Sequence, residues 1–234
     1  MFLKKKILCL IPARGGSKGI KLKNLKKIEN KSLVSHTINF AKSLKFIDEI
    51  VLSSDHKKII DSGIKLGTKI HYRSKKLSGD FVADISLILD VIKNKKYYNF
   101  DYLLYLQPTS PFRLKRDFVK ALKNLIKKKA DATWSVTSIS NKNHPLKILK
   151  QNSKNYIQTY INSGNKIIAR QQLDRVFIRN GIFYFFLIKK LRNKKTIYLK
   201  KNLPYEINYK YINIDNQADL KKARKLFSEK RKSK

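Results

Sequence analysis

The stretch IPARGGSKG, residues 11–19, decides the fold class, because it joins an apolar run ending at Pro12 to a glycine-rich loop. A short apolar run stopped by proline is typical of a buried β-strand. Gly15, Gly16 and Gly19 let the backbone adopt positive φ and turn several N–H groups toward one point. In open α/β sheets, ligands bind outside the carboxyl ends of the strands, which is where this loop is expected.

The loop is also positively charged, since Arg14, Lys18, Lys21 and Lys23 lie in it or beside it. Fixed cations next to converging N–H groups suit a triphosphate. The loop matches neither the dinucleotide pattern G-x-G-x-x-G nor the P-loop pattern G-x-x-x-x-G-K-[ST]. Its glycines alone therefore leave two interpretations open, an ordinary turn beside lysines and a phosphate cradle.

Short apolar runs alternate with amphipathic segments through the first part of the chain. We expect strands at residues 6–11, 49–53, 69–72, 102–106 and 132–138, and helices at residues 32–44, 56–66, 82–92 and 114–128. This alternation predicts an α/β fold with a doubly wound, mostly parallel sheet and helices on both faces.

Beyond residue 139 the pattern changes to polar, Asn-rich segments with short β-like pieces at residues 147–149, 156–160 and 183–186. This change predicts a small antiparallel arm over residues 140–180. We expect a late strand that ends at residues 213–215 and a closing helix at residues 217–229. No linker or internal repeat divides the chain, so we expect a single domain over residues 1–234.

The chain carries 54 Lys and Arg against 16 Asp and Glu, a formal net charge of +38. The basic residues are mostly lysines spread along the whole sequence, which favours a solvated surface that attracts anionic substrates over a specific nucleic-acid interface. No apolar run reaches the roughly 18 residues that a membrane span needs. The first apolar run is too short for a signal peptide. We therefore expect a cytoplasmic protein, with Cys9 as a buried structural thiol.

Two longer motifs carry a family resemblance. IPARGGSKGIKLKNL at residues 11–25 resembles the N-terminal signature of the acylneuraminate (CMP-sialic acid) cytidylyltransferases, and LQPTSPFR at residues 106–113 resembles their L-Q-P-T-S-P-x-R. RQQL at residues 170–173, with the segment 179–184, is similar to their R-Q-x-L-P and N-G-x-x-Y. The resemblance covers nearly the whole chain and implies a Rossmann-like nucleotidyltransferase fold, with residues 140–180 as a dimerisation arm and hence a homodimer.

The same resemblance implies an enzyme that transfers CMP from CTP to the anomeric hydroxyl of a nonulosonic, sialic-type sugar acid and releases pyrophosphate. The implied nucleotide-binding residues are Arg14, Gly15, Ser17, Lys18, Lys23, Asn24 and Asp80. The implied sugar-binding residues are Gln107, Arg170, Asn180 and Tyr184. The implied catalytic residues are Arg14, Lys23 and Asp215. Arg73 and residues 77–80 resemble a segment that lines the cytosine and sugar pocket.

The resemblance further implies a Mg²⁺ cofactor, because the family closes with a D-x-D pair that holds this ion. Here the matching residues are Asn213 and Asp215. Residues two apart in a strand face the same side, so both side chains could reach one ion. Asparagine supplies a neutral oxygen in place of a charged one, which predicts weaker Mg²⁺ affinity. In the alternative interpretation, Asp215 only caps the last helix.

Three alternatives to a sialic acid substrate remain open. Pseudaminic or legionaminic acid would be activated by the same chemistry, whereas the octulosonate enzymes carry a different first loop. A family member that binds nucleotide without turnover is supported only by Asn213. A basic nucleic-acid-binding protein is suggested only by the net charge.

Overall fold

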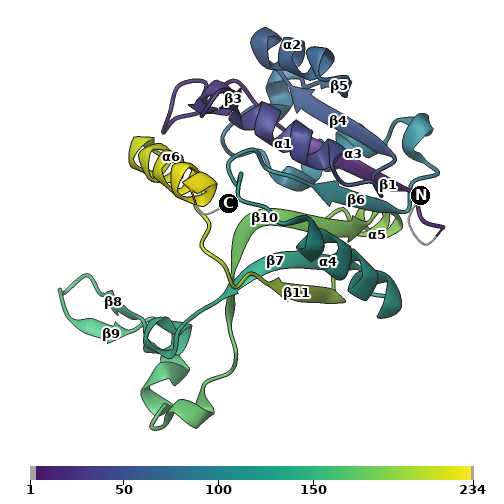
Figure 1. Ribbon diagram of the computed structural model, residues 1–234. Coiled ribbons are helices and arrows are strands. Elements are labelled where there is room, and N and C mark those ends of the chain that lie inside the picture. Colours follow the sequence, from purple (N-terminus) through teal and green to yellow (C-terminus); the bar gives the residue numbers. More distant parts are fainter. Residues whose placement is uncertain (1–3, 233–234) are drawn as a thin grey trace.

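A computed structural model describes residues 4–232, and its centre is a seven-stranded sheet in the order β11-β7-β10-β6-β1-β4-β5 (Figure 1). The strands of this sheet are β1 (Ile7–Pro12), β4 (Glu49–Ser54), β5 (Lys69–Tyr72), β6 (Tyr102–Tyr105), β7 (Ala132–Ser138), β10 (Phe177–Leu187) and β11 (Asn202–Glu206). β1 pairs in parallel with β4 and β6, β4 with β5, and β11 with β7. β10 runs antiparallel between β6 and β7.

Within residues 4–232, six α-helices surround the sheet or flank it. They are α1 (Leu33–Lys42), α2 (Lys57–Lys65), α3 (Asp84–Ile92), α4 (Lys115–Lys127), α5 (Ile188–Lys194) and α6 (Gln217–Lys232). Short 3₁₀ turns occur at Lys23–Leu25, Lys75–Leu77, Lys95–Tyr97, Asn141–Asn143, Pro145–Lys147, Asn162–Lys166 and Arg170–Gln172. Within residues 4–232, no helix combines the length and the apolar character that a membrane span requires.

Alternating side chains of β1 divide the core into two layers. Ile7, Cys9 and Ile11 face the layer that contains α1, α2 and α4, while Leu8 and Leu10 face the layer of α3 and α5. A strand that is apolar on both faces is expected when helices cover both sides of a parallel sheet. The predicted doubly wound α/β class is therefore confirmed.

A third cluster attaches α6 to the edge of the domain. Leu220, Ala223 and Leu226 of α6 are buried with Phe112 and Ile214. The two-stranded ribbon of β2 (Lys27–Ile28) and β3 (Lys31–Ser32) belongs to the same region. This packing brings the C-terminal segment back beside the first loop, although about 200 residues separate them in the sequence.

The expected elements of the first 139 residues are confirmed with bounds shifted by at most two residues. The later part needs correction. Residues 211–216 do not form a strand, and β10 is an eleven-residue member of the central sheet. β11 and α5 were not anticipated. β11 is polar, lies at the sheet edge and contains Pro204, and these features are tolerated at an edge but hide a strand in sequence.

The arm, residues 140–180, projects from the sheet in Figure 1 before β10 returns to it. It contains a separate hairpin of β8 (Leu149–Gln151) and β9 (Ile157–Thr159). In the predicted piece at residues 147–149, Lys147 ends a 3₁₀ turn and the strand begins only at Leu149. His144 is buried in the arm, where its ring accepts from Leu146 N and lies 3.2 Å from Asp174 O, which is a structural role.

Candidate functional site

A pocket of about 490 Å³ lies at the carboxyl ends of β1 and β6. Four segments line it: the glycine-rich loop, the connection from β5 to α3, the loop after β6, and the segment before α6. The lining residues are Pro12, Arg14, Ser17, Lys18, Gly19, Lys23, Asn24, Arg73, Gly79, Asp80, Phe81, Val82, Asp84, Tyr105, Gln107, Pro108, Thr109 and Asp215. The location is the one that the sequence predicts for a ligand site.

Backbone contacts hold the glycine-rich loop against the end of β4. Gly15 N donates to Asp55 Oδ1 at 2.8 Å, and Ala13 N donates to Ser53 O at 2.9 Å. Asn24, which is buried, donates from Nδ2 to Arg14 O at 2.9 Å. The loop is therefore fixed at both ends, which orders its cations before any ligand arrives.

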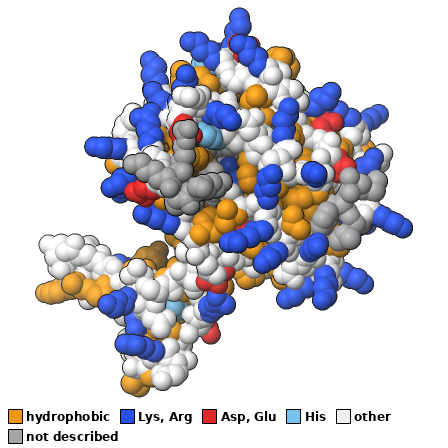
Figure 2. Space-filling model, viewed as in Figure 1, with side chains coloured by type: hydrophobic (Ala, Val, Ile, Leu, Met, Phe, Trp, Pro, Cys, Tyr) orange, Lys and Arg blue, Asp and Glu red, His pale blue; other side chains and the backbone are white. Residues whose placement is uncertain are grey.

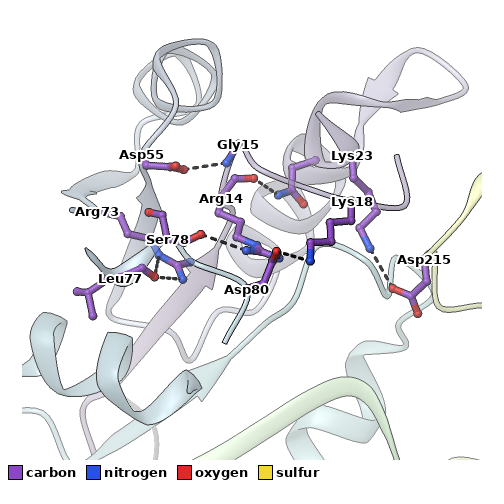
Figure 3. A network of polar contacts seen from close by, with 11 residues as sticks. Arg14, Gly15, Lys18, Lys23, Asp55, Arg73, Leu77, Ser78, Asp80 and Asp215 are labelled. Atoms are coloured by element: carbon purple, nitrogen blue, oxygen red, sulfur yellow. Dashed lines mark hydrogen bonds and ion pairs between the residues drawn. The ribbon is translucent and has the colours of Figure 1, made fainter. Parts of the chain in front are cut away.

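Carboxylates engage the cations of the loop (Figure 3). Asp80 Oδ1 lies 2.6 Å from Arg14 Nη2, and Asp80 Oδ2 lies 2.9 Å from Lys18 Nζ. Hydrogen bonds from Lys18 and Arg14 lower the pKa of Asp80. Arg14 also donates to Ser78 O at 3.1 Å. Asp80 thus accepts with both oxygens from two side chains that the sequence assigns to phosphate.

Lys23 and Asp215 form the other ion pair of the pocket, with 2.9 Å between Nζ and Oδ1. The Lys23 side chain is 15% exposed and that of Asp215 is 74% exposed, so the carboxylate remains open to a ligand. Asp215 does not cap α6. That role belongs to Asn216 and Asp219, whose side chains accept from each other's backbone N–H at 3.0 and 3.1 Å.

Asn213 is held away from this ion pair. Its Oδ1 accepts from Ser110 Oγ at 2.7 Å, and its Nδ2 donates to Asn180 O at 2.9 Å. The segment is not a strand, so the argument that placed Asn213 and Asp215 on one strand face is wrong. The amide of Asn213 fastens the loop after β6 to β10.

Arg113 organises the loop after β6. Its guanidinium donates to Gln107 O at 2.6 Å and to Ile182 O at 3.1 Å. Burial lowers the pKa of Arg113 to about 10, so the side chain stays charged at neutral pH. Gly181, with φ of +72°, lies so close that a Cβ there would sit 3.1 Å from Gln107 Oε1. These contacts aim the Gln107 side chain into the pocket region.

The structure adds a polar group that the sequence did not single out. Tyr105 OH donates to Asp84 Oδ1 at 2.6 Å, and both residues line the pocket. Burial raises the pKa of Tyr105 well above its usual value, so it is a donor at neutral pH. Arg73 lies nearby, with its Nε 2.7 Å from Leu77 O. No sequence signal predicts this group, because Asp84 begins a helix and Tyr105 ends a strand far along the chain.

The predicted residues fall into four groups. The pocket-lining group is Arg14, Ser17, Lys18, Lys23, Asn24, Asp80, Gln107 and Asp215. Gly15, Asn180 and Asn213 are outside the lining and hold backbone in place. Tyr184 lines a small adjoining cavity that shares Asp84 and Tyr105 with the pocket. Arg170 is exposed on the arm. The roles assigned to all these residues remain predictions.

The pocket offers few side chains that could bind a metal ion. Within residues 4–232, no group of three or more His, Cys, Asp or Glu side chains could hold a metal ion. Asp215 offers one open carboxylate, and Mg²⁺ commonly binds through one or two carboxylates together with substrate phosphates. The residues present therefore fit Mg²⁺ that arrives with a nucleotide triphosphate.

Known proteins resemble this chain over nearly its whole length. The family model described as cytidylyltransferase matches residues 8–233. The chain is 29% identical over 227 residues to the pseudaminic acid cytidylyltransferase of Campylobacter jejuni, covering 95% of this chain and 96% of that protein. It is also 29% identical over 226 residues to the CMP-N,N'-diacetyllegionaminic acid synthase of Legionella pneumophila, covering 94% and 96%.

Solved structures show the same fold at lower identity. CMP:2-keto-3-deoxy-manno-octonic acid synthetase complexed with CTP has a TM-score of 0.73 at 17% identity, covering 97% of this chain and 100% of that one. A 4-diphosphocytidyl-2C-methyl-D-erythritol synthase from Anaerococcus prevotii has a TM-score of 0.65 at 17% identity, covering 96% of each chain.

Proposed function

The chain belongs to the cytidylyltransferase family, and we propose that it transfers CMP from CTP to the anomeric hydroxyl of a nonulosonic sugar acid, with release of pyrophosphate. The observation that carries the proposal is the pocket, in which Arg14, Lys18 and Lys23 face one cavity together with Gln107. Relatives that match over nearly their whole length are named for pseudaminic and legionaminic acid activation.

The triphosphate is assigned to the glycine-rich loop. Arg14, Ser17, Lys18 and Lys23 supply charge and hydrogen bonds, and Gly15 holds the loop through Asp55. Such chemistry depends on positioning and charge neutralisation more than on covalent catalysis. Because Asp80 accepts from Arg14 and Lys18, the phosphates must take over these two cations. Asn24 keeps the loop closed through Arg14 O.

The sugar acid is assigned to the side of the pocket formed by Gln107. Tyr184 borders the adjoining cavity, and Asn180 fixes the backbone between them. The anomeric hydroxyl attacks the α-phosphorus and loses its proton to solvent, and the P–O bond to the β-phosphate breaks so that pyrophosphate leaves. Arg14 and Lys23 neutralise the charge that develops on the phosphate oxygens. Mg²⁺ held by Asp215 and the phosphates would supply Lewis-acid stabilisation of the leaving pyrophosphate.

A substrate panel tests the proposal. The purified protein is incubated with CTP, Mg²⁺ and each of N-acetylneuraminic, legionaminic, pseudaminic and 3-deoxy-manno-octulosonic acid, and pyrophosphate release is measured. We expect release with at least one of the first three acids. CTP binding without release would identify a member that binds nucleotide without turnover, and the absence of both would refute the proposal.

The exposed side chains of the arm are a reason to propose a homodimer, and we propose separately that the protein acts in the cytoplasm. Leu149, Tyr156, Ile157, Tyr160 and Ile168 are 57 to 94% exposed on it. Figure 2 shows hydrophobic side chains at several places on the projecting arm, beside a few lysines and arginines. Exposed apolar side chains concentrated on one projection are typical of a protein–protein contact. Arg170, which the arm carries, would then reach the sugar side of the partner's pocket.

Analytical ultracentrifugation tests the dimer. We expect the wild type to be a dimer at assay concentration. The double variant Tyr156→Ser, Ile157→Ser should shift the equilibrium toward monomer. The matched control is Tyr72→Ser, since Tyr72 is equally exposed but lies on β5. A wild-type monomer at the concentration that gives full activity would contradict the assembly and leave the exposed arm unexplained.

A further inference from the structure

The pair of Asp84 and Tyr105 forms an acceptor in the wall of the pocket that the reaction at phosphorus does not use. Asp84 is the first residue of α3, and Tyr105 is the last residue of β6. The Tyr105 hydroxyl donates to one carboxylate oxygen, Oδ1, at 2.6 Å, and this hydrogen bond leaves the other oxygen, Oδ2, uninvolved. The carboxylate is thereby oriented and left with accepting capacity toward the cavity.

The position of Asp84 and Tyr105 along the pocket limits which part of a bound nucleotide they can contact. In Figure 3, Lys23 and Asp215 lie at one end of the polar network, Arg73 lies at the other, and Arg14 with Asp80 lies between them. Burial lowers the pKa of Arg73, and the negative charge of nearby Asp84 acts in the opposite direction, which places the two side chains near each other. If the phosphates occupy the cationic loop, the Arg73 end receives the remainder of the nucleotide.

A carboxylate at that end distinguishes pyrimidines by their hydrogen-bonding edge. Cytosine carries a 4-amino donor, with N3 and O2 as acceptors, whereas uracil carries a 4-carbonyl acceptor and an N3–H donor. Carboxylates accept well from the cytosine amino group. A guanidinium such as that of Arg73 can donate to the acceptors on the same edge. Uracil would set its 4-carbonyl against the negative carboxylate, which leaves two acceptors facing each other.

We propose that Asp84, positioned by Tyr105, is the residue that selects cytosine over uracil in the nucleotide substrate. The proposal rests on the proposed function, because it assumes that a nucleoside triphosphate lies in this pocket. In this proposal the Asp84 carboxylate accepts a hydrogen bond from the 4-amino group of cytosine. Tyr105 is a positioning residue that acts through Asp84.

The experiment compares kcat/KM for CTP and UTP, with the best sugar acid of the panel, in the full-length protein. We expect Asp84→Asn to reduce the ratio of the two values about tenfold to a hundredfold, since one hydrogen bond to a charged group is lost and an amide can serve either base. Tyr105→Phe shifts the ratio in the same direction by less. Binding of both nucleotides by calorimetry provides a second readout that needs no turnover.

The chain offers a matched control. Asp117 lies in the first turn of α4 and accepts from Tyr205 OH at 3.0 Å, so it repeats the Asp–Tyr pair away from the pocket. Asp117→Asn and Tyr205→Phe should leave the CTP to UTP ratio within twofold of wild type. If Asp84→Asn does not fold, wild-type binding of a pyrimidinone nucleoside triphosphate, which lacks the 4-amino group, should fall by a similar factor.

Three results would overturn the proposal. Equal losses for CTP and UTP in Asp84→Asn would show a purely structural role. Loss of discrimination between CTP and dCTP, with the CTP to UTP ratio unchanged, would place Asp84 at the ribose. Undiminished binding of the pyrimidinone nucleotide would show that the amine is not read. Failure of the wild type to bind any nucleoside triphosphate would instead refute the function on which the proposal rests.

Discussion

Gly19 sits where the glycine-rich loop meets the segment before α6, and its replacement by alanine should disable the site. A Cβ at Gly19 would lie 2.2 Å from the backbone oxygen of Asp215, whereas real Cβ contacts essentially never fall below 3.0 Å. Loop and segment would therefore have to separate by about 0.8 Å. Neither side of this contact is a flexible side chain, so the backbone itself must move.

The expected magnitude follows from what this separation disturbs. Lys23 and Asp215 lie 2.9 Å apart across the same junction, and both face the pocket. A misplacement of about 1 Å in a site that works by positioning can cost a hundredfold in rate. We expect Gly19→Ala to lower kcat/KM about a hundredfold. Any loss of global stability should be confined to the third cluster, where Ile20 and Ile214 adjoin the junction.

Gly16 supplies the control within the same loop. A Cβ at Gly16 would meet nothing within 4 Å, and the backbone there is not in the positive-φ region. Gly16→Ala should therefore keep kcat/KM within about twofold of wild type. Gly15→Ala should fall between the two, because its Cβ would lie 2.8 Å from the Cβ of His56. Pyrophosphate release at several CTP concentrations measures all three variants, and equal activity of Gly19→Ala and Gly16→Ala would refute the reasoning.

Three further changes have defined outcomes. Asp80→Asn should raise affinity for pyrophosphate in calorimetry, because it frees the two loop cations, and weaker binding would show instead that the carboxylate contacts the ligand. Arg113→Lys should lower the free energy of unfolding in urea by about 2 kcal/mol, because one ammonium cannot replace the guanidinium fork, and an unchanged midpoint would contradict this. Asn213→Asp should lower the melting temperature without raising Mg²⁺ affinity, because it removes the donor to Asn180 O, and a gain in Mg²⁺ affinity would restore the metal-ligand interpretation.

The first half of the fold could be predicted because local pattern and global fold agree there. β1, β4 and β6 are short apolar runs, and each is followed by a loop and an amphipathic helix. Local preference and burial point to the same structure in such segments. The glycine-rich loop was placed correctly for the same reason, since a strand that ends at proline fixes where the loop begins.

The second half could not be predicted because tertiary contacts decide it. The apolar piece at residues 183–186 belongs to β10, whose first residues are exposed and whose pairing is interrupted near Gly181. β11 has only two alternating apolar side chains, Leu203 and Tyr205, on either side of Pro204, and it is defined by its pairing with β7. Residues 213–215 read as a strand end because isoleucine alternates with polar residues, yet the contacts of Asn213 with Ser110 and Asn180 hold them in an irregular segment.

In the site, the loop motif predicts the cations, whereas only the fold shows which carboxylates lie beside them. The chain has 16 acidic residues against 54 basic ones, so acids are scarce, yet three of them line the pocket. Asp80 and Asp215 engage the cations of the glycine-rich loop, and Asp84 is bound by Tyr105. Clustered cations repel one another, and carboxylates between them offset this repulsion and hold the cations in fixed positions. An anionic ligand would then replace the carboxylates as the partner of the cations. The excess of lysine therefore indicates little about function, whereas the position of the few carboxylates defines both the phosphate end and the base end of the pocket.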